Sequence, residues 1–229
     1  ANEQVIEEIA ELVGDRLVLV PFDKPFNFSE KCNLGALAAT GEILLFLNDD
    51  VQVIDGNFIE VLVGFVRESD VGAASLRLLF EDGRVQHAGH VYLGGNPGHL
   101  MFGQMPNSDR NRLALSLDRE VAGVTAACMA IRAEVFEQVG GFSMVFAGNY
   151  NDVDLCLKLR REGYRIIVSA QATMYHFESI TRDPTVGEGE LEALRQRWST
   201  ELSSDPYYNP NFDQRFDNYP HPVMYPNKY

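Results

Sequence analysis

The sequence predicts an α/β fold, in which strands and helices alternate along the chain. Residues 17–20, 43–47 and 71–76 are short apolar runs of the kind that form strands. Residues 29–40 and 57–67 lie between these runs and carry apolar side chains at helical spacing, with Ser29 expected as an N-cap. This alternation indicates a parallel sheet with crossover helices, whose ligands bind beyond the carboxyl ends of the strands.

The rest of the chain predicts further elements around this unit. A helix is expected at 3–13, and the Asp82-Gly83 pair predicts a hairpin between 78–80 and 85–93. Residues 94–112 are rich in Gly, Asn, Pro and Asp, which predicts a long loop. Strands are expected at 121–131, 165–168 and 172–175, and helices at 134–139, 151–162 and 191–202. We therefore expect one domain over 1–202, followed by an extended Pro- and Tyr-rich tail at 203–229.

Composition excludes several classes of protein. The net charge of −14 disfavours nucleic acid as a partner, because its binding depends on Lys and Arg. No apolar run approaches the roughly 20 residues that span a bilayer. The three cysteines are odd in number and form no CxxC pair, which favours buried thiols in a reducing cytoplasm over disulfides or a cysteine-ligated zinc site.

The triplet Asn48-Asp49-Asp50 directly follows the apolar run at 43–47. Two carboxylates at the end of a buried strand suit a divalent cation, which in turn suits a phosphate-bearing substrate. A polar turn that ends a strand is the alternative, because acids also favour turns. The triplet alone leaves both interpretations open.

Two other polar groups also end or begin predicted elements. Asp152 and Asp154 begin a helix, where N-capping is favoured over catalysis as the explanation of such acids taken alone. His176 follows the strand at 172–175, where a lone histidine is commonly a surface or core residue. The histidines at 87, 90 and 99 flank the long loop and could contact an acceptor, although ordinary structural roles are favoured. Together, the two acid clusters and His176 could form one metal–phosphate site with a nearby base.

A set of short polar and glycine-containing segments occurs in a fixed order along the chain: Asn33-x-Gly35, 39–42 (ATGE), 47–50 (LNDD), 123–128 (GVTAAC), 140–142 (GGF), 151–154 (NDVD), 163–165 (GYR), 175–179 (YHFES) and 205–210 (DPYYNP). This order resembles family-2 glycosyltransferases of the GT-A fold, over roughly residues 20–215. The fold implied is a Rossmann-like mixed sheet flanked by helices. The sequence is most similar to bacterial members that build cell-surface polysaccharides such as O-antigen or rhamnose-rich glycans.

The resemblance implies a role for each matching residue. Asn48-Asp49-Asp50 occupies the position of the DxD motif, which holds Mn²⁺ or Mg²⁺ on the donor diphosphate. Asp50 and His176 would be metal ligands, and Asn48 stands where the motif usually has its first acid. Asp152 matches the catalytic base. The residues that would contact the nucleotide-sugar donor are Asp49, Gly123, Thr125, Ala126 and Asp154.

The expected function is that of an inverting, metal-dependent glycosyltransferase of hexosyl or rhamnosyl type. It would move a sugar from a nucleotide-diphosphate sugar to a glycan or lipid-linked acceptor in the cytoplasm, or peripherally at the inner face of the membrane. A nucleotidyltransferase of related fold and a non-catalytic glycan-binding fragment are the alternatives. Family members open with two strands that cradle the nucleotide, and residues 1–16 contain neither. We therefore expect either a piece of a larger multidomain protein or an unusually truncated member of the family, with an exposed sheet edge that favours self-association.

Overall fold

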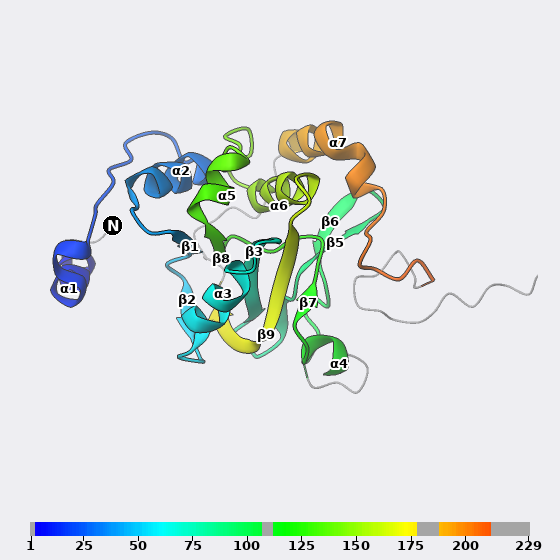
Figure 1. Ribbon diagram of the computed structural model, residues 1–229, viewed down its shortest axis with the longest axis horizontal. Coiled ribbons are helices and arrows are strands. Elements are labelled where there is room, and N and C mark those ends of the chain that lie inside the picture. Colours follow the sequence, from blue (N-terminus) through cyan, green and yellow to red (C-terminus); the bar gives the residue numbers. More distant parts are fainter. Residues whose placement is uncertain (1–2, 107–111, 178–187, 212–229) are drawn as a thin grey trace, which may run out of the picture.

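A seven-stranded mixed sheet forms the centre of the protein, with helices on both faces (Figure 1). The structure, a computed structural model, describes residues 3–106, 112–177 and 188–211. The main path through the sheet follows the order β1-β8-β3-β9-β2, with β4 added beside β3 and β7 beside β9. The strands of this sheet are β1 (Ile43–Leu47), β2 (Val51–Val53), β3 (Val71–Leu79), β4 (Val85–His87), β7 (Arg119–Glu120), β8 (Cys128–Arg132) and β9 (Arg165–His176).

The sheet is mixed, as the resemblance implied, and is not the parallel sheet that alternation alone predicted. Strands β3 and β9 pair in parallel, whereas β1 pairs with β8 and β2 pairs with β9 in antiparallel fashion. Strands β1 and β2 therefore lie at the two ends of the path, and the predicted self-association through an exposed sheet edge stays a prediction. The period of two along β8 explains how the sheet holds two cores, because Met129 and Ile131 face one side while Cys128 and Ala130 face the other.

The helices cover the sheet as their apolar spacing requires. Helix α3 (Phe58–Val66) packs on one face through Leu62 and Val66. Helices α2 (Phe28–Ala38), α5 (Ala133–Gln138) and α6 (Asn151–Arg161) cover the other face. Asn27, and not Ser29, caps α2, since its side chain accepts a hydrogen bond from the backbone N–H of Glu30. The remaining helices are α1 (Glu3–Val13), the 3₁₀ helix Gly14–Arg16, α4 (Arg112–Leu115) and α7 (Glu188–Leu202).

Several segments differ from the sequence prediction. Of the strand predicted at 121–131, residues 121–127 form no strand, because the backbone N–H groups of 124–126 donate to side chains and not to a neighbouring strand. The strands predicted at 165–168 and 172–175 are parts of one continuous strand, β9.

Residues 17–20 form no strand, and the side chains of Val18 and Leu19 are 62% and 58% exposed. Apolar character selects a strand only where a neighbouring strand offers a ladder, and none of the described strands lies beside this segment. The predicted loop at 94–112 contains β6 (Asn96–His99), which pairs with β5 (His90–Leu93) as a separate two-stranded sheet.

The start of the tail packs against the domain. Tyr208 joins an apolar cluster with Val85, Val91 and Met101, and Asp205 is also buried. Both oxygens of the Asp205 carboxylate accept backbone hydrogen bonds, one of them from Tyr92 on β5. The rest of the predicted tail, 212–229, lies outside the described residues. Within the described part of the chain, no helix is both long enough and apolar enough to cross a membrane.

Candidate active site

Strand pairing brings Asp50 and His176 together. Asp50 closes the turn between β1 and β2, and the next residue, Val51, pairs with His176 in the β2–β9 ladder. The backbone N–H of Phe177 donates to the carbonyl of Asp50 at 2.9 Å, which fixes the two segments side by side. As a result, His176 Nε2 lies 3.0 Å from Asp50 Oδ1 and 3.3 Å from Asn48 Nδ2. Asp49 lies in the same turn and is exposed.

Gln86 on β4 fixes the orientation of the His176 ring. Its side-chain oxygen lies 2.6 Å from His176 Nδ1, and its side-chain nitrogen donates to the carbonyl of His176 at 3.3 Å. A neutral His176 therefore carries its proton on Nδ1 and turns the lone pair of Nε2 toward Asp50. A histidine that binds a metal is commonly held in this way by a second hydrogen bond.

The donor set at Asp50 and His176 fits Mn²⁺ or Mg²⁺. Two adjacent ligands of an octahedral ion, at bond lengths of about 2.1 Å, lie about 3 Å apart. The separation of 3.0 Å between Asp50 Oδ1 and His176 Nε2 matches this value. When His176 is neutral, the carboxylate and the imidazole lone pair face each other as two electron donors, and a cation could bind between them. Asn48 presents its amide nitrogen to His176, and it would have to turn its oxygen inward to act as a ligand.

Asp152 lies against the segment that the resemblance assigns to the donor sugar. It is the second residue of α6, and its carboxylate accepts the backbone N–H of Ala126 at 3.2 Å and that of Val153 at 2.8 Å. Tyr150, just before the helix, adopts a left-handed backbone with φ of 60°, an uncommon conformation for a residue other than glycine. The side chain of Asp152 remains 17% exposed, so it can reach a substrate.

Residues 125–127 connect the two halves of the site. The carbonyl of Ala127 accepts the backbone N–H of Asn48 at 2.9 Å, and the N–H of Ala126 donates to Asp152. The N–H of Thr125 donates to His87 Nε2 at 3.2 Å. Three successive residues therefore tie the acidic turn, the carboxylate of Asp152 and a histidine of β4 into one constellation.

Asp154 belongs to the core, unlike Asp152. Its side chain is fully buried, and Oδ1 accepts a hydrogen bond from Trp198 Nε1 at 2.8 Å. Arg197 Nε lies 3.3 Å from the same oxygen, and Lys158 Nζ lies 3.8 Å from Oδ2. Helix periodicity explains the contrast, because residues two positions apart point to different sides of a helix. This burial favours a structural part for Asp154 over the predicted contact with a cofactor.

The histidines at 87, 90 and 99 form a buried cluster beside Asp152. His87 Nδ1 lies 2.8 Å from His99 Nδ1, and the rings of His90 and His99 meet edge to face with centroids 5.2 Å apart. His90 Nε2 lies 4.0 Å from Asp152 Oδ2. Burial is the main cause that lowers the pKa of each imidazole below its ordinary value, so all three are neutral near pH 7.

Hydrogen bonding favours a proton-sharing cluster over a metal site at these histidines. The three rings are close enough to hold a metal ion. However, His87 Nε2 accepts the N–H of Thr125, so the proton of neutral His87 is on Nδ1 and is donated to His99. A metal ion on His87 Nδ1 would have to displace that proton. Gln86 was not identified from sequence, and the three histidines were named there only as residues that could contact an acceptor. The pairing of β4 with β3, which brings these side chains to the site, is set by tertiary structure.

Comparison with known proteins identifies the family. A sequence profile described as "Glycosyltransferase like family 2" matches residues 1–200. The chain belongs to this glycosyltransferase family. It is 38% identical over 205 residues to the "O-antigen biosynthesis protein RfbC" of Myxococcus xanthus, covering 87% of this chain and 16% of that protein. It is 37% identical over 211 residues to the "Uncharacterized protein y4gI" of Sinorhizobium fredii (strain NBRC 101917 / NGR234), covering 86% of this chain and 23% of that one. The chain thus spans less than a quarter of the length of either relative.

Solved structures of other glycosyltransferases share the fold. The chain resembles GalNAc-T7 in complex with UDP, GalNAc and Mn²⁺, with a TM-score of 0.66 and 13% identity over 86% of this chain and 40% of that chain. It also resembles the mannosyltransferase PcManGT of Pyrobaculum calidifontis in complex with GDP-Man and Mn²⁺, with a TM-score of 0.55 and 18% identity over 78% of this chain and 45% of that chain. The GT-A fold expected from the sequence is therefore confirmed.

Proposed function

We propose that this glycosyltransferase moves a sugar from a nucleotide-diphosphate sugar with inversion, using Asp152 as the base. The observation that carries the proposal is the linkage through residues 125–127, which holds the carboxylate of Asp152 and the acidic turn at Asp50 on the same backbone segment. An inverting transfer needs a base on one side of the anomeric carbon and an anchor for the leaving group on the other.

The residues divide this reaction between them. The oxygen of the acceptor hydroxyl forms a bond to the anomeric carbon, and the carboxylate of Asp152 accepts the proton of that hydroxyl. At the same time, the bond from the anomeric carbon to the diphosphate breaks. The N–H of Ala126 holds the carboxylate in place during the transfer. Asp50 and His176, with Asn48 nearby, would hold Mn²⁺ or Mg²⁺, which supplies charge stabilisation to the departing nucleoside diphosphate. Asp49, Gly123, Thr125 and Ala126 would line the donor, as the resemblance implies.

The biological setting is inferred from the relatives. The similarity to an O-antigen biosynthesis protein supports a role in building a bacterial surface polysaccharide, with a hexosyl or rhamnosyl donor and a glycan or lipid-linked acceptor. The Mn²⁺ and nucleotides bound by the two solved relatives support a divalent metal and a nucleotide-linked donor. The low share of the relatives' length that the chain covers supports a place in a larger multidomain protein.

The variant Asp152→Asn tests the base. We expect turnover of the nucleotide-sugar donor to fall by about 10²–10⁴-fold, because the amide cannot accept the proton, while Mn²⁺-dependent binding of the donor stays unchanged. The exposed residue Asp23 offers a matched control, and Asp23→Asn should leave turnover unaltered. Turnover within a few-fold of the parent in Asp152→Asn would refute the assignment. A nucleotidyltransferase would instead release pyrophosphate, and a glycan-binding module would show no turnover in the parent chain.

A further inference from the structure

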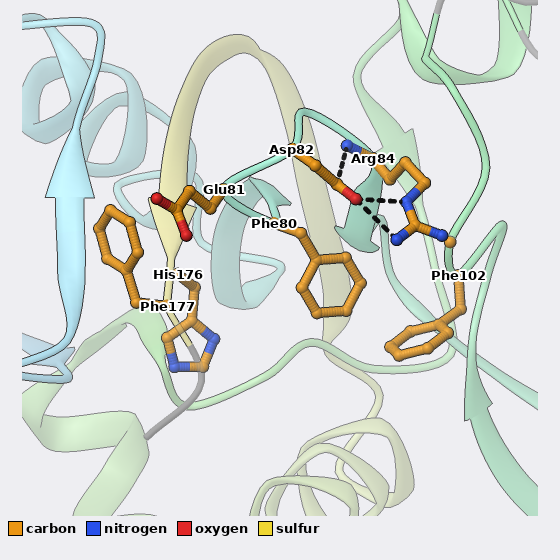
Figure 2. A pocket seen from close by; sticks show the side chains of 8 residues that line it. Phe80, Glu81, Asp82, Arg84, Phe102, His176 and Phe177 are labelled. Carbon is orange, nitrogen blue, oxygen red and sulfur yellow. Dashed lines mark hydrogen bonds and ion pairs between the residues drawn. The ribbon is translucent and has the colours of Figure 1, made fainter. Parts of the chain in front are cut away.

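A cleft of about 530 Å³ opens beside His176, formed by the turn between β3 and β4, residues 102–103 and the end of β9. Figure 2 shows its side chains, with the rings of Phe80 and Phe102 on one side and His176 and Phe177 on the other. Asp152, residues 123–127 and the acidic turn do not account for this cleft, because the side chains of Phe80, Phe102 and Phe177 form none of the hydrogen bonds that hold those parts of the site.

Aromatic rings give the cleft an apolar surface that is open to solvent. Phe80 and Phe102 meet edge to face with centroids 5.2 Å apart. Phe102 is 45% exposed and Phe177 is 41% exposed, although burying either ring would be favourable. Grouped exposed rings in a concave site indicate a ligand that covers them. The flat C–H face of a sugar ring has the size and shape to do so.

Charge excludes other occupants of the cleft. Glu81 and Asp82 both contribute carboxylates to the lining, while Arg84, the lone guanidinium there, is already paired with Asp82 at 2.6 Å. On the wall opposite the candidate metal ligands, the carboxylate of Glu81 therefore has no cationic side chain among the lining residues to balance it, which disfavours an acidic sugar or a phosphate against that wall. Carboxylates also disfavour an alkyl chain, because they would lose water without a partner. A neutral polyol satisfies both features, since its hydroxyls can donate to Glu81 while its C–H face covers a ring.

The cleft lies between the two halves of the site. On one side, His176 lines it and stands 3.0 Å from Asp50. On the other side, Phe102 packs on His99 with ring centroids 6.1 Å apart, and the histidine cluster continues from there to Asp152. A molecule in the cleft is thus bordered both by the candidate metal ligand and by the side chains that lead to the candidate base.

We propose that this cleft binds an uncharged sugar unit of the glycan acceptor, with Phe80 and Phe102 as the platform for its C–H face and Glu81 as the acceptor for its hydroxyls. The proposal rests on the proposed function, which it deepens by naming the class of acceptor. The turn between β3 and β4 and residues 102–103 would then select neutral glycans over anionic or lipid-pyrophosphate acceptors.

Saturation-transfer NMR on the full chain tests the proposal with three probes. These are a set of neutral methyl glycosides including rhamnoside, mannoside, glucoside and galactoside, a methyl glucuronide, and a short isoprenyl pyrophosphate. We expect at least one neutral glycoside to bind, and Phe102→Ala to weaken it by about tenfold, since a lost ring contact of about 1.4 kcal/mol has that effect. Phe102→Tyr should restore binding, and Phe26→Ala, at a 61% exposed ring outside the cleft, should leave it unchanged.

Several results would overturn the inference. These are binding of none of the neutral glycosides, binding that Phe102→Ala leaves intact, or preferential binding of the glucuronide or the pyrophosphate in a manner that depends on Phe102. Because the experiment contains no donor and measures no turnover, its failure is distinct from failure of the proposed reaction, which the Asp152→Asn variant tests separately.

Discussion

The buried carboxylate of Asp154 should stabilise the folded state by several kcal/mol. Asp154→Ala removes the partner of Trp198 Nε1, Arg197 and Lys158 at once. Trp198 is fully buried and the side chain of Lys158 is 14% exposed, so neither regains full hydration. Removing one partner of a buried ion pair costs about 3–5 kcal/mol, and we expect the free energy of unfolding to fall by that amount.

A double-mutant cycle isolates the hydrogen bond between the two side chains. Trp198→Phe removes the N–H donor and should cost about 1.5–3 kcal/mol, because the acceptor is a buried carboxylate that also contacts Arg197 and Lys158. Since both changes remove the same bond, the double variant should be less destabilised than the sum of the single variants by about 1–3 kcal/mol. Urea unfolding followed by circular dichroism measures all three, with the exposed Asp23→Ala as a control expected within about 0.5 kcal/mol of the parent.

Two outcomes would refute this reasoning. A loss below about 1 kcal/mol in Asp154→Ala would mean that the carboxylate is replaceable in the core. Strict additivity in the cycle would mean that Trp198 and Asp154 stabilise the fold independently.

Two further predictions concern the histidine cluster. A Cβ on Gly123 would lie 2.8 Å from His90 Nδ1, so Gly123→Ala should destabilise the protein by about 1–3 kcal/mol in urea unfolding. At Gly35 the added carbon would have no atom within 4 Å, so Gly35→Ala should stabilise its helix by about 0.5–1 kcal/mol. Equal effects of the two substitutions would contradict the packing argument. Burial lowers the pKa of the three imidazoles, so below the unfolded value of about 6.5 the unfolded chain binds protons that the folded chain does not. The free energy of unfolding should therefore fall as the pH decreases from about 6.5 toward 4. A flat profile over that range would show that the rings can be protonated in place.

Local pattern was sufficient to predict most elements. The apolar run at 43–47 formed β1, and the hairpin with Asp82-Gly83 formed between β3 and β4. These elements were predictable because strand ends and helix starts are encoded by nearby residues. The structure also brings Asp50 close to His176, and Asp152 close to Ala126, as the motif order of the resemblance led us to expect, while the roles of these residues stay predictions.

Features set by distant pairing could not be predicted in this way. The apolar run at 17–20 resembles a strand in sequence, but pairing decides its conformation. Asp152 and Asp154 are the same residue type, and the sequence alone does not distinguish them. The packing of Trp198 buries the carboxylate of Asp154, while that of Asp152 stays accessible. Gln86 could not be identified as the partner of His176 because the two residues are 90 positions apart.

The strand register also bears on how the protein folds during synthesis. Strand β1 cannot pair until β8 has been synthesised, and β2 cannot pair until β9 has been synthesised. Val51 can therefore pair with His176 only after 125 further residues have been added. At translation rates of about 5–20 residues per second, this interval is about 6–25 s. During that time, the apolar residues of β1 and the acids of Asn48-Asp49-Asp50 have been made but neither their ladder nor His176 exists. The candidate metal site is therefore among the last parts of the central sheet that a nascent chain can complete, and a nascent chain would be exposed to misassociation through β1 and β2 until then.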